Sequence, residues 1–176
     1  VALLNDLFGI QSRGGCSCAG PYGHTLLGID VEKSHAYERE IALGCEGIKP
    51  GWVRVNFNYF ISEQVFTFVV AAVAFVARHG HHILVDYDFD PTTGIRRHRD
   101  GPGEPPLRLT DVTSDAAGRL SYPHHDDRAP ESVLTDYLRQ AERLLAERAG
   151  QDEDDRGGLR DDFEALRWFQ LPSVSV

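Results

Sequence analysis

The sequence predicts an α+β domain, a small antiparallel sheet with helices packed on one face of it. Three stretches support this prediction. Residues 52–60, WVRVNFNYF, alternate apolar and polar side chains, as a half-buried strand does. Residues 63–79 are apolar nearly all round a helix, and residues 131–149 have the spacing of an amphipathic helix.

The first fifty residues contain shorter elements. Apolar side chains at helical spacing predict a helix over residues 1–8, and Gly9 is a typical helix stop. The following elements are expected in order: a short strand at 10–13, a glycine-rich loop at 14–23, a helix with a broken apolar face at 24–45, and a turn at 47–51 that leads into the strand at 52–60.

The second half begins with a well-marked helix. Ser62 is a good N-cap, and Gly80 is expected to end the helix after residue 79. Because this helix is so apolar, we expect it to be covered on several sides. Another strand is expected at 83–89 and a turn at 91–94, and the acidic stretch 151–158 is expected to be a solvated linker.

The pattern divides the chain into three parts. Residues 1–100 form the expected domain core, residues 101–130 a linker or irregular region, and residues 131–176 a helical C-terminal extension. Within the extension, the aromatic tail FEALRWFQLP at 163–172 has enough apolar surface to dock back on the core.

Composition narrows the class of protein. The chain has 176 residues and a formal net charge of −9, with its arginines scattered among acids, so no nucleic-acid partner is expected. The apolar run at 66–77 is too short for a bilayer span, and no secretory leader is visible, so the sequence predicts a cytoplasmic protein without a membrane partner. The chain contains no Met and begins at Val1 within a helical pattern, and we therefore expect a fragment of a longer protein.

Three cysteines, Cys16, Cys18 and Cys45, are too few and odd in number for a disulfide scaffold. A bridge between Cys16 and Cys18 would strain the disulfide geometry. Zinc ligand pairs usually have two or more residues between them, and no second close pair of cysteines is present. The histidine doublets at 81–82 and 124–125 are interpreted as surface residues, so no metal is expected.

The stretch RGGCSCAGPYGH at residues 13–24 allows several interpretations. A phosphate loop would need a Lys-Ser/Thr ending that is absent. The cysteines could be small buried residues in a tight turn. A nucleophile fits the surroundings better, because Arg13 lies upstream and the expected helix from residue 24 would point its positive end at the loop. Cys18 is the cysteine nearer that helix.

Two segments together resemble a known family. IQSRGGCSCAGP, followed about thirty residues later by GWVRVNFNYF, resembles the C-terminal part of class V aminotransferase-fold enzymes, and within them the cysteine desulfurase and selenocysteine lyase group. That group uses pyridoxal phosphate (PLP) and has an Arg-x-Gly-x-x-Cys-Ala-x-Pro segment after a short strand. This chain matches it with Arg13, Gly15, Cys18, Ala19 and Pro21.

The resemblance implies the fold of the small C-terminal domain of fold-type I PLP-dependent transferases, over about the first eighty residues. It also implies roles for single residues. Arg54 would hold the substrate carboxylate, and Arg13 would share that contact or favour the thiolate of Cys18. Cys18 would attack the substrate sulfur and keep it as a persulfide, releasing an alanine-level product. Cys16 and His24 are possible accessory residues, and Cys16 departs from the group's pattern.

The PLP lysine is missing from the matched region. The chain has two lysines, Lys33 in a charged helical stretch and Lys49 in a turn, and neither has the His-Lys setting of the family. We therefore expect PLP to be bound mainly by an upstream domain, and this chain alone to be inactive. The implied partners are an L-cysteine-like amino acid, a second copy in a homodimer, and a protein that accepts the sulfur.

Two alternatives remain open. The intact protein could be a class V aminotransferase or lyase acting on another amino acid. The chain could instead be a non-catalytic interaction module that uses the helix at 131–149 and the tail FEALRWF as a partner surface.

Overall fold

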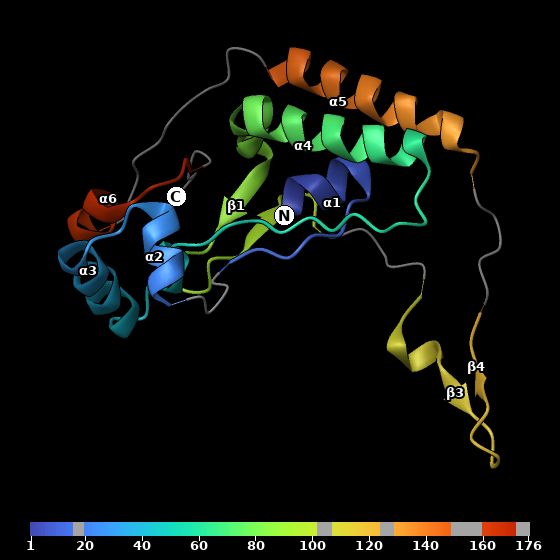
Figure 1. The fold of residues 1–176 in the computed structure, drawn as a ribbon, viewed down its shortest axis with the longest axis horizontal. Coiled ribbons are helices and arrows are strands. Elements are labelled where there is room, and N and C mark those ends of the chain that lie inside the picture. Colours follow the sequence, from blue (N-terminus) through green and yellow to red (C-terminus); the bar gives the residue numbers. More distant parts are fainter. Residues whose placement is uncertain (16–19, 102–106, 124–128, 149–159, 172–176) are drawn as a thin grey trace.

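The computed structural model describes residues 1–15, 20–101, 107–123, 129–148 and 160–171. It is an α+β fold, as the sequence predicts, with helices and two small antiparallel sheets (Figure 1). The described helices are α1 (Ala2–Phe8), α2 (Pro21–Leu27), α3 (Val31–Ala42), α4 (Glu63–Ile83), α5 (Leu134–Arg148) and α6 (Asp161–Leu166). The strands are β1 (Tyr87–Phe89), β2 (Arg96–His98), β3 (Thr113–Ser114) and β4 (Leu120–Ser121). Single 3-10 turns occur at Glu46–Ile48, Leu84–Asp86, Leu109–Asp111 and Glu131–Val133.

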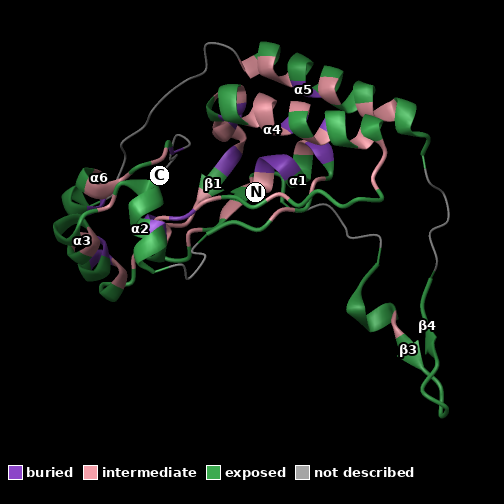
Figure 2. Cartoon of the chain, viewed as in Figure 1, coloured by how far each residue is buried: buried purple, intermediate pink, exposed green. Residues whose placement is uncertain are grey.

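Helices α1, α4 and α5 form the main apolar layer (Figure 1). Helices α4 and α5 run in the same direction, since Gln64 donates a hydrogen bond to the carbonyl of Glu131 at one end and Arg148 binds Asp86 at the other. The core that these two helices share with α1 consists of Leu4, Phe8, Phe68, Ala72 and Ala141, all buried. Figure 2 shows buried residues on α1 in purple. Small alanines at the crossing let the backbones of α4 and α5 approach closely.

Helix α4 begins as the sequence predicts and ends later. The Ser62 hydroxyl accepts a hydrogen bond from the Val65 amide at 3.1 Å, which is the expected N-cap. Gly80 does not end the helix. It is buried within α4, where a Cβ atom would come within 3.0 Å of the Leu3 side chain. The absent side chain therefore makes room for α1, and α4 continues to Ile83.

The expectation that α4 is covered on several sides is wrong. Only part of it is buried, against α1 and α5, while Phe66 and Val70 on another face are more than two-fifths exposed. The apolar run at 66–77 is part of a longer helix. The continuous helical segment Glu63–Asp86 has 24 residues and could cross a membrane by length and composition, a test that core helices of soluble proteins also pass.

The predicted strands are mostly shorter in the structure. Of residues 83–89, only Tyr87–Phe89 form a strand, which pairs with Arg96–His98 across the predicted turn. Residues 10–13 and 52–60 contribute one isolated bridge rather than two strands. The helix predicted over 24–45 is two helices, α2 and α3, separated at Gly28, whose φ of 62° is left-handed.

The rest of the chain has two further parts. The tail docks back as predicted, because Phe163 of α6 is buried against Tyr37 and Ile48 in a second core. The Trp168 indole also donates a hydrogen bond to the carbonyl of Ile48 at 3.2 Å. By contrast, the β3–β4 hairpin lies inside the predicted irregular region and extends away from the helical layer (Figure 1). The predicted linker at 151–158 lies outside the described residues.

Candidate functional site

The two arginines that the sequence singles out lie opposite each other. Arg54 donates its backbone N–H to the Arg13 carbonyl at 2.7 Å, and Arg13 donates to the Arg54 carbonyl at 3.2 Å. Such an exchange defines a hydrogen-bonded antiparallel pair, in which the Cα atoms lie about 5.5 Å apart and both side chains project from the same face. Residues 41 positions apart in the chain are thereby brought together.

Two glycines permit this pairing. The Trp52 N–H donates to the Gly15 carbonyl at 3.4 Å, which continues the ladder by one step. A Cβ atom on Gly51 would lie 2.4 Å from the Gly15 carbonyl oxygen, closer than real Cβ contacts allow. Glycine at position 51 is therefore required for the two segments to meet. Gly15 itself has a φ of 98°, which other residues rarely adopt.

The predicted alternation of the 52–60 segment is seen only in part, because Val53, Phe57 and Tyr59 are exposed as well as the polar residues. Val55 packs against the core of α1, α4 and α5, while its neighbour Arg54 is exposed. Arg13 is exposed too. Among the described residues, neither guanidinium has a carboxylate or other hydrogen-bond partner. Two arginines on one face therefore present planar donor groups that an anion can bind.

Asn56 continues this polar face. Its side-chain amide donates to Asn58 Oδ1 at 3.3 Å, so the two amides lie on the same side of an extended segment. Both side chains are exposed.

The structure says less about the other site residues that the sequence predicts. Cys16 and Cys18 lie outside the described residues, and so does the doublet at 124–125. His24 is an exposed residue of α2. Its backbone N–H donates to the Gly20 carbonyl. Cys45 is a half-buried free thiol that packs against the second core. Within the described ranges, no group of three or more acidic, histidine or cysteine side chains is arranged to hold a metal.

His81 and His82 lie on α4 rather than beside a strand. Their ring centroids are 3.8 Å apart at the helix end. His81 is exposed and His82 is half-buried. The two rings are tilted against each other at an interplanar angle of 40°.

The described residues do not form a PLP site. Lys33 lies over the ring of Tyr37 at 5.9 Å, and Lys49 forms an ion pair with Glu46. Both side chains are at the surface of local helical turns, and neither lines the polar cavity described below. Neither lysine is placed to form a Schiff base with a cofactor in a closed site.

The structure also shows a polar cavity that the sequence did not single out. It has a volume of about 650 Å³ and is lined by Ala2, Asn5, Asp6, Leu7, Ile83, Asp86, Tyr87, Arg96, Arg97, His98, Gly101 and Leu144. These residues come from α1, the end of α4, the β1–β2 hairpin and α5. The basic run RRHR after the turn at 91–94 was the one signal in the sequence.

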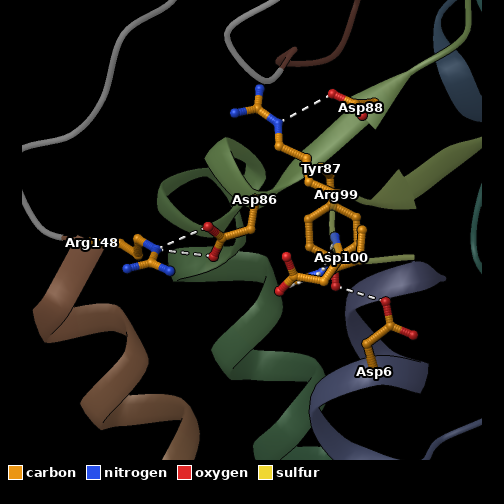
Figure 3. A network of polar contacts seen from close by, with 8 residues as sticks. Asp6, Asp86, Tyr87, Asp88, Arg99, Asp100 and Arg148 are labelled. Atoms are coloured by element: carbon orange, nitrogen blue, oxygen red, sulfur yellow. Dashed lines mark hydrogen bonds and ion pairs between the residues drawn. The ribbon is translucent and has the colours of Figure 1, made fainter. Parts of the chain in front are cut away.

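Hydrogen bonds organise the walls of this cavity (Figure 3). The Tyr87 hydroxyl donates to Asp6 at 2.7 Å, and Arg148 Nε donates to both oxygens of Asp86 at 3.0 Å. Burial, followed by the bond to Asp6, raises the pKa of Tyr87 well above its usual range. The phenol therefore stays protonated and remains a donor. The hydrogen bonds to Asp86, followed by the negative charge of that carboxylate, raise the pKa of Arg148.

Comparison with known proteins adds no relative. No family model, no curated protein and no solved structure matches this chain.

Proposed function

We propose that the chain binds the carboxylate of an amino-acid substrate, as the small C-terminal domain of a PLP-dependent enzyme of the class V aminotransferase fold. The bridge between Arg13 and Arg54 is the observation that supports this proposal. Two guanidiniums on one face can each form two parallel hydrogen bonds with a carboxylate, an arrangement that lysine cannot reproduce. Like charges placed opposite each other are unfavourable without an anion.

The proposed reaction is of the cysteine desulfurase type. In it, Cys18 takes the sulfur of an L-cysteine-like substrate as a persulfide, while Arg54 and Arg13 hold the substrate carboxylate. The resemblance of residues 13–21 and 51–60 to that group supports this assignment. Neither Lys33 nor Lys49 is placed to form a Schiff base in a closed site, so we propose that the PLP lysine belongs to another part of the natural protein, which works as a cytoplasmic homodimer and passes the sulfur to an acceptor protein.

Carboxylate binding can be tested on this chain. We expect L-alanine to shift the NMR signals of the Arg13 and Arg54 amides, and L-alaninamide, which lacks the carboxylate, to leave them unchanged. Arg54→Gln should weaken alanine binding at least tenfold, and Arg54→Lys should do so to a smaller extent. Arg39→Gln is the matched control, an exposed arginine on α3. Equal shifts with both ligands would overturn the proposal.

Sulfur transfer needs the full-length gene product. We expect it to show the visible absorption of bound PLP and to form a persulfide with L-cysteine. Cys18→Ala should abolish the persulfide, and Cys16→Ala should retain it. Turnover that survives Cys18→Ala would instead indicate a class V aminotransferase or lyase acting on another amino acid.

A second candidate is an interaction module, in which an aromatic strip contacts a second copy of the chain. The strip consists of Phe57, Tyr59, Phe60 and Phe66. Tyr59 is 99 % exposed and Phe60 71 %, and both form ring contacts only within the strip among the described residues. Exposed aromatic clusters are typical of protein contact surfaces. The tail proposed from the sequence for this role is instead largely occupied, because Phe163 and Phe169 pack against the chain itself.

Sedimentation equilibrium tests the second candidate. A dimer that dissociates on Tyr59→Ser, while Tyr22→Ser has no effect, would support it. Tyr22 is the matched control because it is an exposed tyrosine of α2. A monomeric wild-type chain would exclude self-association through the strip.

A further inference from the structure

We propose that the cavity between α1 and the β1–β2 hairpin binds a small organic oxyanion, a carboxylate or a phosphate ester with an apolar body. The cavity shares no lining residue with the Arg13–Arg54 bridge. Its volume of about 650 Å³ lies within the range of small-molecule sites, roughly 300–1,000 Å³. The binding site is therefore additional to the proposed carboxylate site.

The charges of the cavity wall favour an anion. Asp86 is neutralised by Arg148, and Asp6 already accepts the Tyr87 hydroxyl. Arg96 has no carboxylate or hydrogen-bond acceptor among the described residues, whereas Arg97 lies opposite Asp88 and projects from the other face of the hairpin. With Arg148 counted, the arginines outnumber the carboxylates Asp6 and Asp86, and the Arg96 guanidinium is left with donors for a ligand.

Arg96 is held in a fixed orientation. Its guanidinium carbon lies 4.6 Å from the centroid of the Phe89 ring and 4.8 Å from that of Phe169. Stacking of this kind occupies the faces of a guanidinium and leaves the N–H groups at its edge available. Burial lowers the pKa of Arg96, which indicates that the group is partly desolvated. A partly desolvated cation interacts more strongly with an anion than a solvated one does.

The other walls supply apolar contact. Ile83 is buried at the base of the cavity, and Leu7 and Leu144 pack against the same cluster. Asn5 adds an exposed amide at the rim. A ligand with an anionic group at Arg96 and an apolar body against the leucines would satisfy both kinds of wall. Inorganic phosphate would satisfy only the cationic part of the wall.

NMR titration of the chain with phenylphosphate, benzoate and inorganic phosphate tests the proposal. We expect phenylphosphate or benzoate at millimolar concentration to shift the amides of Asn5 and of Arg96–His98. Inorganic phosphate should bind at least tenfold more weakly, which corresponds to about 1.4 kcal/mol. A preference between phenylphosphate and benzoate would identify the anionic group. Absence of shifts at the cavity would overturn the proposal, and equal binding of inorganic phosphate would overturn its apolar part.

Two variants assign the binding to Arg96. Arg97→Gln lies on an exposed strand position on the other face of the hairpin and should fold normally, whereas Arg96→Gln removes the guanidinium that stacks on Phe89 and Phe169. Arg96→Gln should weaken phenylphosphate binding at least tenfold, and Arg97→Gln should weaken it less. Arg78→Gln is the matched control, an exposed arginine of α4 outside the cavity. Unchanged binding in Arg96→Gln would contradict the proposal, and equal weakening in Arg97→Gln or Arg78→Gln would contradict it even if Arg96→Gln proved unstable.

Discussion

Helices α1, α4 and α5 are held together by buried apolar contacts, whereas the segments that carry Arg13 and Arg54 are joined by backbone hydrogen bonds. The layer contains Phe68 and Ala72 at its centre, both buried. The paired segments expose both arginines and meet through Gly15 and Gly51. The contacts that stabilise the fold and the residues of the candidate site therefore lie in separate parts of the molecule. Mutations should affect folding stability and ligand binding separately.

The largest effect should come from Phe68→Ala. The Phe68 ring contacts those of Phe8 and Tyr137 at centroid distances of 6.1 and 6.5 Å, and its loss leaves a cavity between three helices. We expect the free energy of unfolding to fall by about 3–5 kcal/mol, measured by urea denaturation. Phe66→Ala, two residues away and 41 % exposed, should cost much less. Similar losses in both variants would mean that α4 is not buried as described.

Gly51→Ala should act on the other region. The new methyl group would overlap the Gly15 carbonyl, so the two segments must separate. We expect a cost of about 1–3 kcal/mol and faster hydrogen exchange at the Arg54 amide. Gly44→Ala is the control, because Gly44 has a φ of 93° but open space around it. It should cost stability without changing exchange at Arg54. Unchanged exchange in Gly51→Ala would contradict the bridge.

The same contrast explains what the sequence could predict. Periodicity located α1, α4 and α5, because apolar spacing directly determines which helix face is buried. It did not locate the end of α4, since the role of Gly80 depends on Leu3, far away in the chain. A glycine can end a helix or let another helix approach, and local pattern does not distinguish these outcomes.

The sequence identified the residues of the candidate site but predicted little of how they are arranged. Alternation placed Arg54 on the polar side of its segment, and Arg13 was noted as a neighbour of the cysteines. Their direct pairing depends on the approach of Gly51 to Gly15, which alternation does not encode. The cavity was missed because Asp6, Tyr87 and Arg96 come from three different elements. The proposed substrate, cofactor and homodimer remain predictions.

A smaller effect is expected at the cavity wall, where Tyr87→Phe removes the hydrogen bond to Asp6. The loss should be about 1 kcal/mol at neutral pH, because exposed Asp6 can bind water instead. The pKa of Tyr87 is raised in the folded state, so the protonated phenol contributes stability that is complete below the unfolded pKa, about 10, and declines as the pH rises above it.

The pH dependence separates this tyrosine from the others. The stability difference between the wild type and Tyr87→Phe should be about 1 kcal/mol smaller at pH 11 than at pH 9. Urea denaturation at both pH values measures it. Tyr22→Phe, at an exposed position, is the control and should show no such change. A difference that is constant with pH would mean that Tyr87 is not selectively stabilised in its protonated form.

The smallest effect, and the one with the opposite sign, is expected for Arg13→Gln. Like charges directly opposite each other in an antiparallel pair are unfavourable, so removing one guanidinium should stabilise the chain by about 0.2–1 kcal/mol. The gain should disappear in 1 M salt, because the Debye length there is about 3 Å. Arg39→Gln should give no comparable gain. A loss of stability in Arg13→Gln would mean that the guanidinium supports the fold, and the separation between a stable layer and a charged, less stable site would then fail at its central residue.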